Sequence, residues 1–392
     1  MRAARAARGA LRRAVLALSR LLVYRALGLG DLLTAVPALR ALAAAFPEHR
    51  RTLAGPAALA PLARLADPRL EIVDAAALAP LPPELHGADI VVNLHGRGPQ
   101  SHALLRAARP RRLIAWGSTW RADEHEVARW CRLLSEAGVP ADPAALDLPP
   151  PPWVAPAGTS GATLIHPGAA SAARRWPAER WAEVARAEAA AGRQVLLTGS
   201  PAERRLAETV ADRAGLGPEA VLAGRTDIRA LAAAVAAAGR VLAGDTGVAH
   251  LATAFGTPSV VLFGPTSPAH WGPPPARTHH VALWAGTSGD PHADTPDPGL
   301  LRILPEDALC APSSPWVWPR ETPETEDPTM GITDKLTGRV KKAAGDLADD
   351  ASLRQEGRRE ERKGEAKEEL ADAHEKADRK AEEVSDLERK TN

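Results

Sequence analysis

The feature that most constrains the fold is a strand, a glycine turn and a helix in direct succession. The apolar segment 240–243 runs into Gly244-Asp245-Thr246-Gly247, a helical pattern begins at Val248, and residues 259–264 have the pattern of a further strand. In such a unit the first N–H groups of the helix lack partners within it, and the helix dipole favours negative charge there. Thr246 and His250 add a hydroxyl and an imidazole on the same side. Asp245 or Thr246 could equally cap an ordinary turn, but we interpret the turn as the seat of a nucleotide diphosphate.

Strand patterns alternate with helix patterns along most of the chain. Further strands are predicted at residues 21–26, 71–73, 90–93, 113–116, 163–166, 194–198 and 221–226. Strands that alternate with helices form parallel sheets. The proline run Pro149–Pro152 and the Pro, Gly and Ser residues that follow it to Gly161 predict a stiff linker. The fold class is therefore α/β, with two Rossmann-like domains, 21–152 and 153–312, that face each other across a cleft.

A second glycine turn follows the first predicted strand and precedes a helix predicted over 32–46. Gly28 and Gly30 suggest a dinucleotide fingerprint, but its third glycine would fall at Leu33, so a nicotinamide site is excluded. Asp31 then stands at the carboxyl end of the strand, where ligands bind in open α/β sheets. The spacing fits a helix cap and a catalytic carboxylate equally well.

Two polar segments of the first domain have open interpretations. The loop 93–102 contains His95, Arg97 and Gln100, which suit a hydroxyl-rich or phosphorylated ligand or a solvated turn. The helix predicted over 121–136 begins with four polar residues, 123–126, that resemble a metal cluster only superficially. Consecutive residues of a helix point in different directions, so we expect a solvated helix face there.

Composition excludes several classes of function. The 392 residues carry a net charge of +1 with 25% charged residues, so no global field favours a nucleic-acid partner. Cys131 and Cys310 are the only cysteines; they fit a reducing compartment and offer neither a disulfide framework nor a metal cluster. No apolar run reaches the roughly 18 residues that span a bilayer. We therefore expect a cytoplasmic protein.

The ends of the chain differ from its middle in composition. Residues 1–20 are basic and predict a frayed extension, or alternatively a basic helix that touches anionic lipid at the inner face of the plasma membrane. Residues 313–329 are rich in Pro, Ser, Thr and acids and predict a linker. Residues 330–392 contain no Pro or Trp and many charges of both signs, which predicts a mostly helical or disordered tail.

Three separated motifs carry a resemblance to a known family. They are 25–31 with 37–39, 166–168 with 174–177, and 244–250 with 263–266. Over about residues 20–312 the chain resembles glycosyltransferase family 9, the ADP-heptose:lipopolysaccharide heptosyltransferase family. The resemblance implies a GT-B fold and an inverting transfer that needs no metal or other cofactor, and no Asp-x-Asp triplet is present. The tail resembles the CsbD-like family of small stress-induced proteins.

The resemblance also implies roles for individual residues. Asp31 matches the general base of the family, and Arg174 replaces a usual lysine against the diphosphate, which keeps the charge but changes the geometry. The remaining positions on the donor side are Glu203 near the sugar hydroxyls, Thr226 near the nucleoside, and Asp245, Thr246, Gly247 and His250 at the diphosphate turn. The candidates on the acceptor side are Gly30, His95, Arg97 and Gln100.

These inferences predict a glycosyltransferase that moves a heptose-like sugar from a nucleotide-diphosphate donor to a glycan or glycolipid of the cell envelope. Two alternatives stay open at this stage: a non-catalytic nucleotide-binding stress or envelope protein, and a nucleotide-sugar epimerase on the same scaffold. Consumption of the donor that depends on an acceptor would favour the transferase.

Overall fold

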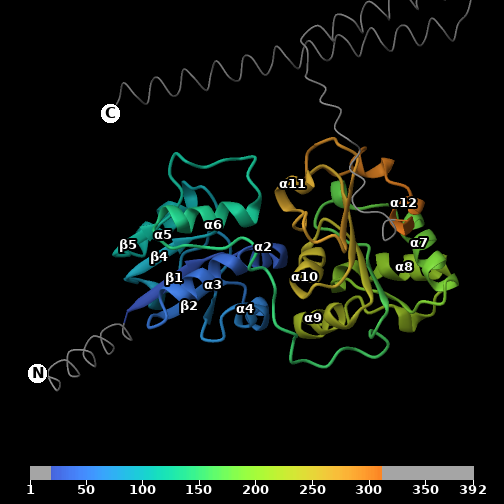
Figure 1. Ribbon diagram of the computed structural model, residues 1–392, viewed down its shortest axis with the longest axis horizontal. Helices are drawn as coiled ribbons and strands as arrows, with labels where there is room; N and C mark the ends of the chain where they lie inside the picture. Colours follow the sequence, from blue (N-terminus) through green and yellow to red (C-terminus); the bar gives the residue numbers. More distant parts are fainter. Residues whose placement is uncertain (1–18, 311–392) are drawn as a thin grey trace, which may run out of the picture. The chain divides into compact units, whose positions relative to one another are not determined.

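A computed structural model describes residues 19–310. The predicted extension up to residue 18, the linker 313–329 and the CsbD-like tail 330–392 lie outside the described residues. The described part forms two five-stranded sheets with helices on their faces (Figure 1).

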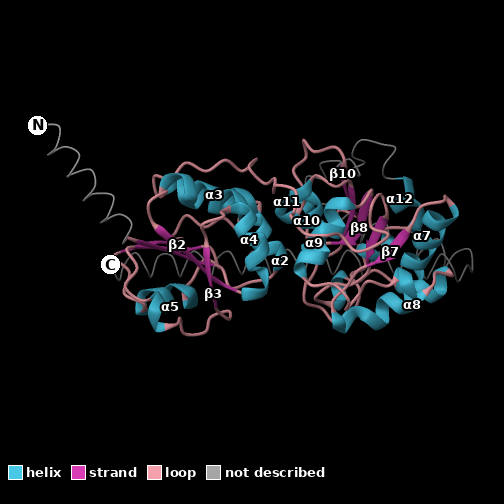
Figure 2. Cartoon of the chain, turned by 90° about the horizontal axis from the view of Figure 1, so that it is seen from below, coloured by secondary structure: helices cyan, strands magenta, loops and turns pink. Residues whose placement is uncertain are grey.

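The first sheet has the strand order β3-β2-β1-β4-β5, and every neighbouring pair is parallel. Its strands are β1 (Arg20–Tyr24), β2 (Arg50–Gly55), β3 (Glu71–Asp74), β4 (Ile90–Asn93) and β5 (Arg112–Ile114). The helices of this half are α2 (Leu29–Thr34), α3 (Val36–Ala45), α4 (Ala60–Ala66), α5 (Gln100–Ala107) and α6 (Glu126–Glu136). Figure 2 shows α3 and α4 on one face of the sheet and α5 on the other. The central strand β1 is apolar throughout after Arg20 because both of its faces are covered.

The second sheet has the order β10-β9-β8-β6-β7 and is also parallel. Its strands are β6 (Thr163–His166), β7 (Val195–Leu197), β8 (Arg240–Gly244), β9 (Ser259–Phe263) and β10 (His280–Trp284). Its helices are α7 (Ala178–Ala190), α8 (Arg204–Ala214), α9 (Ile228–Ala237), α10 (Gly247–Phe255), α11 (Pro268–Trp271) and α12 (Pro305–Cys310). The predicted α/β class with two parallel sheets is confirmed.

One apolar cluster contains side chains from both halves. Leu32 and Leu33 of α2 belong to the same cluster as Val248 and Leu251 of α10. The connection between the sheets also docks on α10, where the Leu148 N–H donates to the carbonyl of Ala254 at 2.8 Å. The glycine turns at the start of these two helices are therefore held on a common core. Within residues 19–310, no helix is both long and apolar enough to cross a membrane.

Several elements differ from the sequence prediction. The single helix predicted over 32–46 is α2 and α3, because Pro37 lies in the first turn of α3, and its ring would clash with a preceding helical turn. The strand predicted over 221–226 is reduced to one bridge between Leu197 and Val221. The helix predicted from residue 121 begins at Glu126, and the His125 side chain before it accepts from the Val127 N–H at 3.2 Å.

The strands β2 and β10 were not predicted. The first three residues of β2 are Arg-Arg-Thr, and such a polar sequence is typical of a solvent-exposed segment. Arg51 is nevertheless buried, because its guanidinium binds both carboxylate oxygens of Asp67, at 2.5 and 2.9 Å. A charge that is neutralised by a distant partner gives no local signal of burial.

Candidate active site

A cavity of about 460 Å³ is bordered by the glycine turn that follows β1 and the glycine turn that follows β8. The first turn contributes Gly28, Leu29, Gly30 and Asp31. The second half contributes His166, Ala169, Ala170, Arg174, Glu203, Asp245, Thr246, Gly247, His250, Thr266, Trp271, Pro291 and His292.

The N-terminus of α10 forms one wall of the cavity. Thr246 is the N-cap residue, yet its hydroxyl does not cap the helix, and Oγ1 is buried without a hydrogen-bond partner among the described residues. The preceding Asp245 is buried, and this burial raises its pKa to about 6, against the opposing charge of Arg174. A free hydroxyl and the first N–H groups of α10 therefore line the same wall, which suits an anion.

Arg174 supplies the cation of this wall. It ends the short turn Ala172–Arg174, and its Nη1 lies 3.4 Å from the carbonyl oxygen of Asp245 and 4.0 Å from the carboxylate Oδ2. Its Nε donates to Ser171 Oγ at 3.3 Å. These long contacts leave donors of the guanidinium available for a ligand, and its side chain is 24% exposed.

Asp31 lines the cavity from the first half of the described chain. It is the third residue of α2, whose cap is Gly28, so the capping alternative does not hold. Its side chain is 28% exposed, and Oδ1 lies 3.3 Å from Nη2 of Arg25. Burial raises the pKa of Asp31, and Glu126 adds to this, while Arg25 and backbone hydrogen bonds lower it. The carboxylate is therefore a stronger base than a solvated aspartate.

The two glycine turns approach each other so closely that side chains would not fit between them. A Cβ on Gly30 would lie 2.8 Å from Cδ2 of His250, and a Cβ on Gly247 would lie 2.7 Å from Cβ of Leu29. Burial lowers the pKa of His250 to about 4, so its imidazole is neutral near pH 7. Asp31 thus lies at the same junction as the helix N-terminus.

Glu203 and His166 also line the cavity. Glu203 Oε2 accepts from the Ser200 N–H at 2.8 Å, and its carboxylate packs against Gly168, where an added Cβ would displace the glutamate side chain. Burial opposes ionisation, but the Ser200 hydrogen bond and His166 hold the pKa of Glu203 below its ordinary value. His166 is buried, which lowers its pKa, and it hydrogen-bonds Thr198 Oγ1 at 3.1 Å.

The remaining residues predicted for the site do not line this cavity. Thr226 immediately precedes Asp227, the N-cap of α9. His95 stacks on Tyr24 with ring centroids 4.7 Å apart, and burial lowers its pKa. Arg97 is exposed in the loop that leads into α5, and Gln100 is exposed as the first residue of that helix. The sequence spacing placed all four near strand ends, but only the fold decides which strand ends share a cavity.

Some lining residues were missed. Trp271, Pro291 and His292 come from segments without regular periodicity, and the 285–298 segment joins the cavity through hydrogen bonds such as Ser171 Oγ to the Pro291 carbonyl at 2.6 Å. Thr266 and His166 lie within the motifs that carried the family resemblance. The motifs could therefore have identified Thr266 and His166 as site residues.

The polar start of α6 is also different from the prediction. Glu126 is buried rather than solvated, because it accepts from Arg25 at 3.0 Å and is paired with Arg129. Glu124 pairs with Arg132 at 2.7 Å. Among residues 19–310, no group of three or more His, Cys, Asp or Glu side chains is arranged to hold a metal ion.

Residues 118–297 match the sequence model of glycosyltransferase family 9 (heptosyltransferase). The resemblance to glycosyltransferase family 9 is confirmed over these residues. Residues 327–379 match the CsbD-like family, so the second resemblance is confirmed as well. Comparison with curated proteins gave no match. Asp31 lies outside the matched residues of the family 9 domain.

Solved structures of similar fold cover most of the described chain. A glycosyltransferase family 9 protein from Veillonella parvula has a TM-score of 0.60 and 21% identity, covering 75% of this chain and 96% of its own. The ADP-heptose lipopolysaccharide heptosyltransferase II of Escherichia coli has a TM-score of 0.59 and 21% identity, covering 74% and 97%. The dodecameric iron-containing heptosyltransferase TibC, in complex with ADP-D-β-D-heptose, has a TM-score of 0.51 and 15% identity, covering 75% of each chain.

These findings confirm the GT-B fold and support a glycosyltransferase. The family match covers the end of the first half and most of the second, including the α10 turn. The fold similarity extends the comparison to the first half, where Asp31 lies.

The close approach of the two glycine turns can be tested with Gly247→Ala. We expect a loss of about 1–3 kcal/mol in the free energy of unfolding, because the added methyl would overlap Leu29 and force the two helices apart. Urea unfolding followed by circular dichroism measures the change. Gly117→Ala is the matched control, since nothing lies within 4 Å of its position. Equal stabilities of the two variants would contradict the packing described here.

Proposed function

We propose that this protein is an inverting, metal-independent glycosyltransferase that moves a heptose-like sugar from a nucleotide-diphosphate donor to a glycan or glycolipid of the cell envelope. The observation that carries the proposal is the single cavity that Asp31 shares with the N-terminus of α10. A base and an anion cradle on facing walls are the two parts that a displacement at an anomeric carbon requires.

The cradle accounts for the donor side of the reaction. The diphosphate of the donor would lie against the N-terminus of α10, with Thr246 Oγ1 and the guanidinium of Arg174 as further donors. Negative charge grows on the diphosphate as the sugar leaves, and preorganised donors in a partly buried site stabilise that charge. In this proposal they do so in place of a metal ion.

Asp31 accounts for the acceptor side. An acceptor hydroxyl loses its proton as it attacks the anomeric carbon, and a carboxylate with a raised pKa takes up that proton more readily than a solvated one. Attack from the Asp31 side, opposite the diphosphate wall, inverts the anomeric configuration. The tight contact of the two glycine turns limits the access of water to the donor.

The donor and acceptor are proposed from the named activities of similar proteins. One protein of similar fold is an ADP-heptose lipopolysaccharide heptosyltransferase, and another is a heptosyltransferase in complex with ADP-D-β-D-heptose. ADP-heptose and a lipopolysaccharide-core oligosaccharide are therefore the first substrates to assay.

Asp31→Asn should lower turnover at least about 100-fold, because the amide cannot accept the proton, while ADP binding is retained. Release of ADP from ADP-heptose in the presence of the acceptor measures turnover, and calorimetry with ADP measures binding. Wild-type turnover in this variant would remove Asp31 from the reaction. Conversion of the donor without any acceptor would favour the epimerase alternative, and ADP binding without any turnover of the wild-type protein would favour a non-catalytic protein.

Arg174→Ala should weaken ADP binding by roughly 10- to 100-fold, since hydrogen bonds to charged groups contribute about 1.5–3 kcal/mol. It should also slow transfer at saturating donor. Calorimetry with ADP measures the first effect. Arg175→Ala is the matched control, because this neighbouring arginine does not line the cavity. Unaltered ADP affinity in Arg174→Ala would exclude the proposed contact.

Donor binding should weaken as the pH rises from 5 to 7. Asp245, whose pKa is about 6, is protonated below this range and anionic above it, and the anion repels the diphosphate. His250, whose pKa is about 4, stays neutral throughout. Uptake of one proton on binding permits at most about a tenfold rise in Kd per pH unit. The diphosphate of ADP-heptose is a diester and does not titrate here, so it is the ligand to use. Asp245→Asn should flatten the dependence; a wild-type Kd that is constant with pH would contradict the prediction.

A further inference from the structure

A buried arginine lies directly behind Asp31. Arg25 follows β1, its side chain is 1% exposed, and its guanidinium is enclosed by acceptors from three directions. Nη1 donates to the Leu94 carbonyl and Nε to the Asp31 carbonyl, while Nη2 contacts Thr34 Oγ1 at 3.2 Å and Glu126 Oε1 at 3.0 Å. The planar group, which also lies 5.0 Å from the centre of a tryptophan ring, has little freedom to move.

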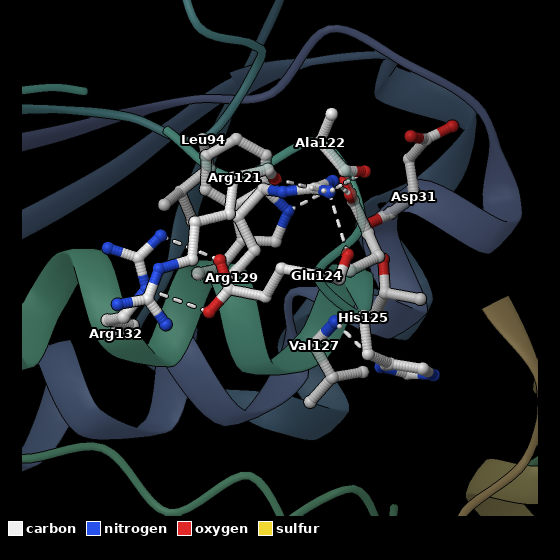
Figure 3. A network of polar contacts seen from close by, with 12 residues as sticks. Asp31, Leu94, Arg121, Ala122, Glu124, His125, Val127, Arg129 and Arg132 are labelled. Carbon is white, nitrogen blue, oxygen red and sulfur yellow. Dashed lines mark hydrogen bonds and ion pairs between the residues drawn. The ribbon is translucent and has the colours of Figure 1, made fainter. Parts of the chain in front are cut away.

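Glu126 holds this arginine from the side away from the cavity. Its Oε1 accepts from Arg25 and from Trp130 Nε1 at 2.7 Å, and its Oε2 is paired with Arg129. Arg129 Nη2 then donates to the carbonyls of Arg121, Ala122 and Glu124 at 3.1, 3.1 and 2.7 Å. A continuous polar network thus connects Asp31 with the 121–124 segment (Figure 3).

The two carboxylates compete for the same nitrogen of Arg25. Nη2 donates to Glu126 Oε1 at 3.0 Å and to Asp31 Oδ1 at 3.3 Å, so the hydrogen bond to Asp31 is the longer of the two. The Asp31 carboxylate accepts this long hydrogen bond and also lines the cavity. If Glu126 did not hold the guanidinium, Asp31 would be its sole carboxylate partner, and a closer pair would withdraw the base from the cavity.

We propose that Arg25 and Glu126 are positioning residues: Glu126 draws the guanidinium of Arg25 toward α6, so that the Asp31 carboxylate stays directed into the cavity and free to accept a proton. This inference rests on the proposed role of Asp31 as the base. It adds a residue from a distant helix to the reaction, with no contact of its own to the substrates.

The electrostatics of Asp31 agree with this geometry. After burial, the largest influences on the pKa of Asp31 are Arg25, which lowers it, and Glu126, which raises it. Glu126 therefore offsets part of the effect of the arginine. The other titratable or charged groups that line the cavity or adjoin it are His125, His166, Arg174, Glu203, Asp245, His250 and His292.

Glu126→Gln tests the proposal. Loss of the negative charge should lower the pKa of Asp31, which a ¹³C-carboxyl NMR titration of aspartate-labelled full-length protein measures without any acceptor. The Asp31 signal is assigned by its loss in Asp31→Asn. With ADP-heptose and acceptor, kcat should fall roughly 10- to 100-fold, as expected for a misplaced catalytic group, with the acid limb of its pH profile displaced to lower pH and the KM for the donor unchanged.

Glu188→Gln is the matched control. Glu188 is fully buried and bridges two arginines, Arg193 at 2.6 Å and Arg240, but it lies away from the cavity. The Glu188→Gln variant measures how much stability is lost when a buried carboxylate between two arginines is neutralised. It should leave both the Asp31 titration and the pH profile unchanged. Thr34→Val removes an uncharged partner of Arg25 Nη2. It should shift the Asp31 pKa and the pH profile in the same direction as Glu126→Gln, but by a smaller amount. This variant replaces Glu126→Gln if that protein is too unstable to titrate.

The outcomes separate this inference from the proposed function. If Asp31→Asn is inactive while Glu126→Gln and Thr34→Val behave like Glu188→Gln, the positioning role is wrong and the base is retained. If Asp31→Asn keeps its turnover, both proposals fail. An Asp31 titration that moves in Glu126→Gln but not in Glu188→Gln supports the positioning role.

Discussion

Everything in the site depends on the close approach of the two glycine turns at the junction of α2 and α10. Gly30 and Gly247 lack side chains where a methyl group would overlap His250 and Leu29. Because packed interiors tolerate little added volume, this contact fixes the distance between the two turns. The proposed base on one turn and the proposed anion site on the other are therefore held together by a steric requirement, and the apolar side chains behind them form one cluster.

Burial then shifts the pKa values of the carboxylates and of the imidazole at the cavity in opposite directions. It raises the pKa of both Asp31 and Asp245 and lowers that of His250, so the cavity contains two carboxylates of increased basicity and a neutral imidazole. The cations are divided between the walls: Arg174 is partly exposed toward the ligand space, whereas Arg25 is enclosed and occupied by protein acceptors. In the proposed reaction the first acts on the leaving group and the second on the base.

Much of the fold was predictable because it depends on local patterns. Buried parallel strands are short apolar runs, and glycine turns mark their ends, so most of the strands of both sheets were found. Two of the failures have a common cause. β2 was missed because the partner that neutralises Arg51 lies on another element, and Glu126 was placed in solvent because its partners, Arg25 and Arg129, could not be seen in a helical pattern.

The sequence by itself determined the α/β class, the two glycine turns and the identities of Asp31, Arg174 and Thr246 as candidates, since these follow from residue order and from motifs. Only the tertiary structure decided which candidates share a cavity: it includes Glu203 and His250, and it leaves out Thr226 and the 93–102 loop. The reason is physical. Chain order fixes which strand ends carry polar residues, but the packing of α2 against α10 fixes which of those ends meet.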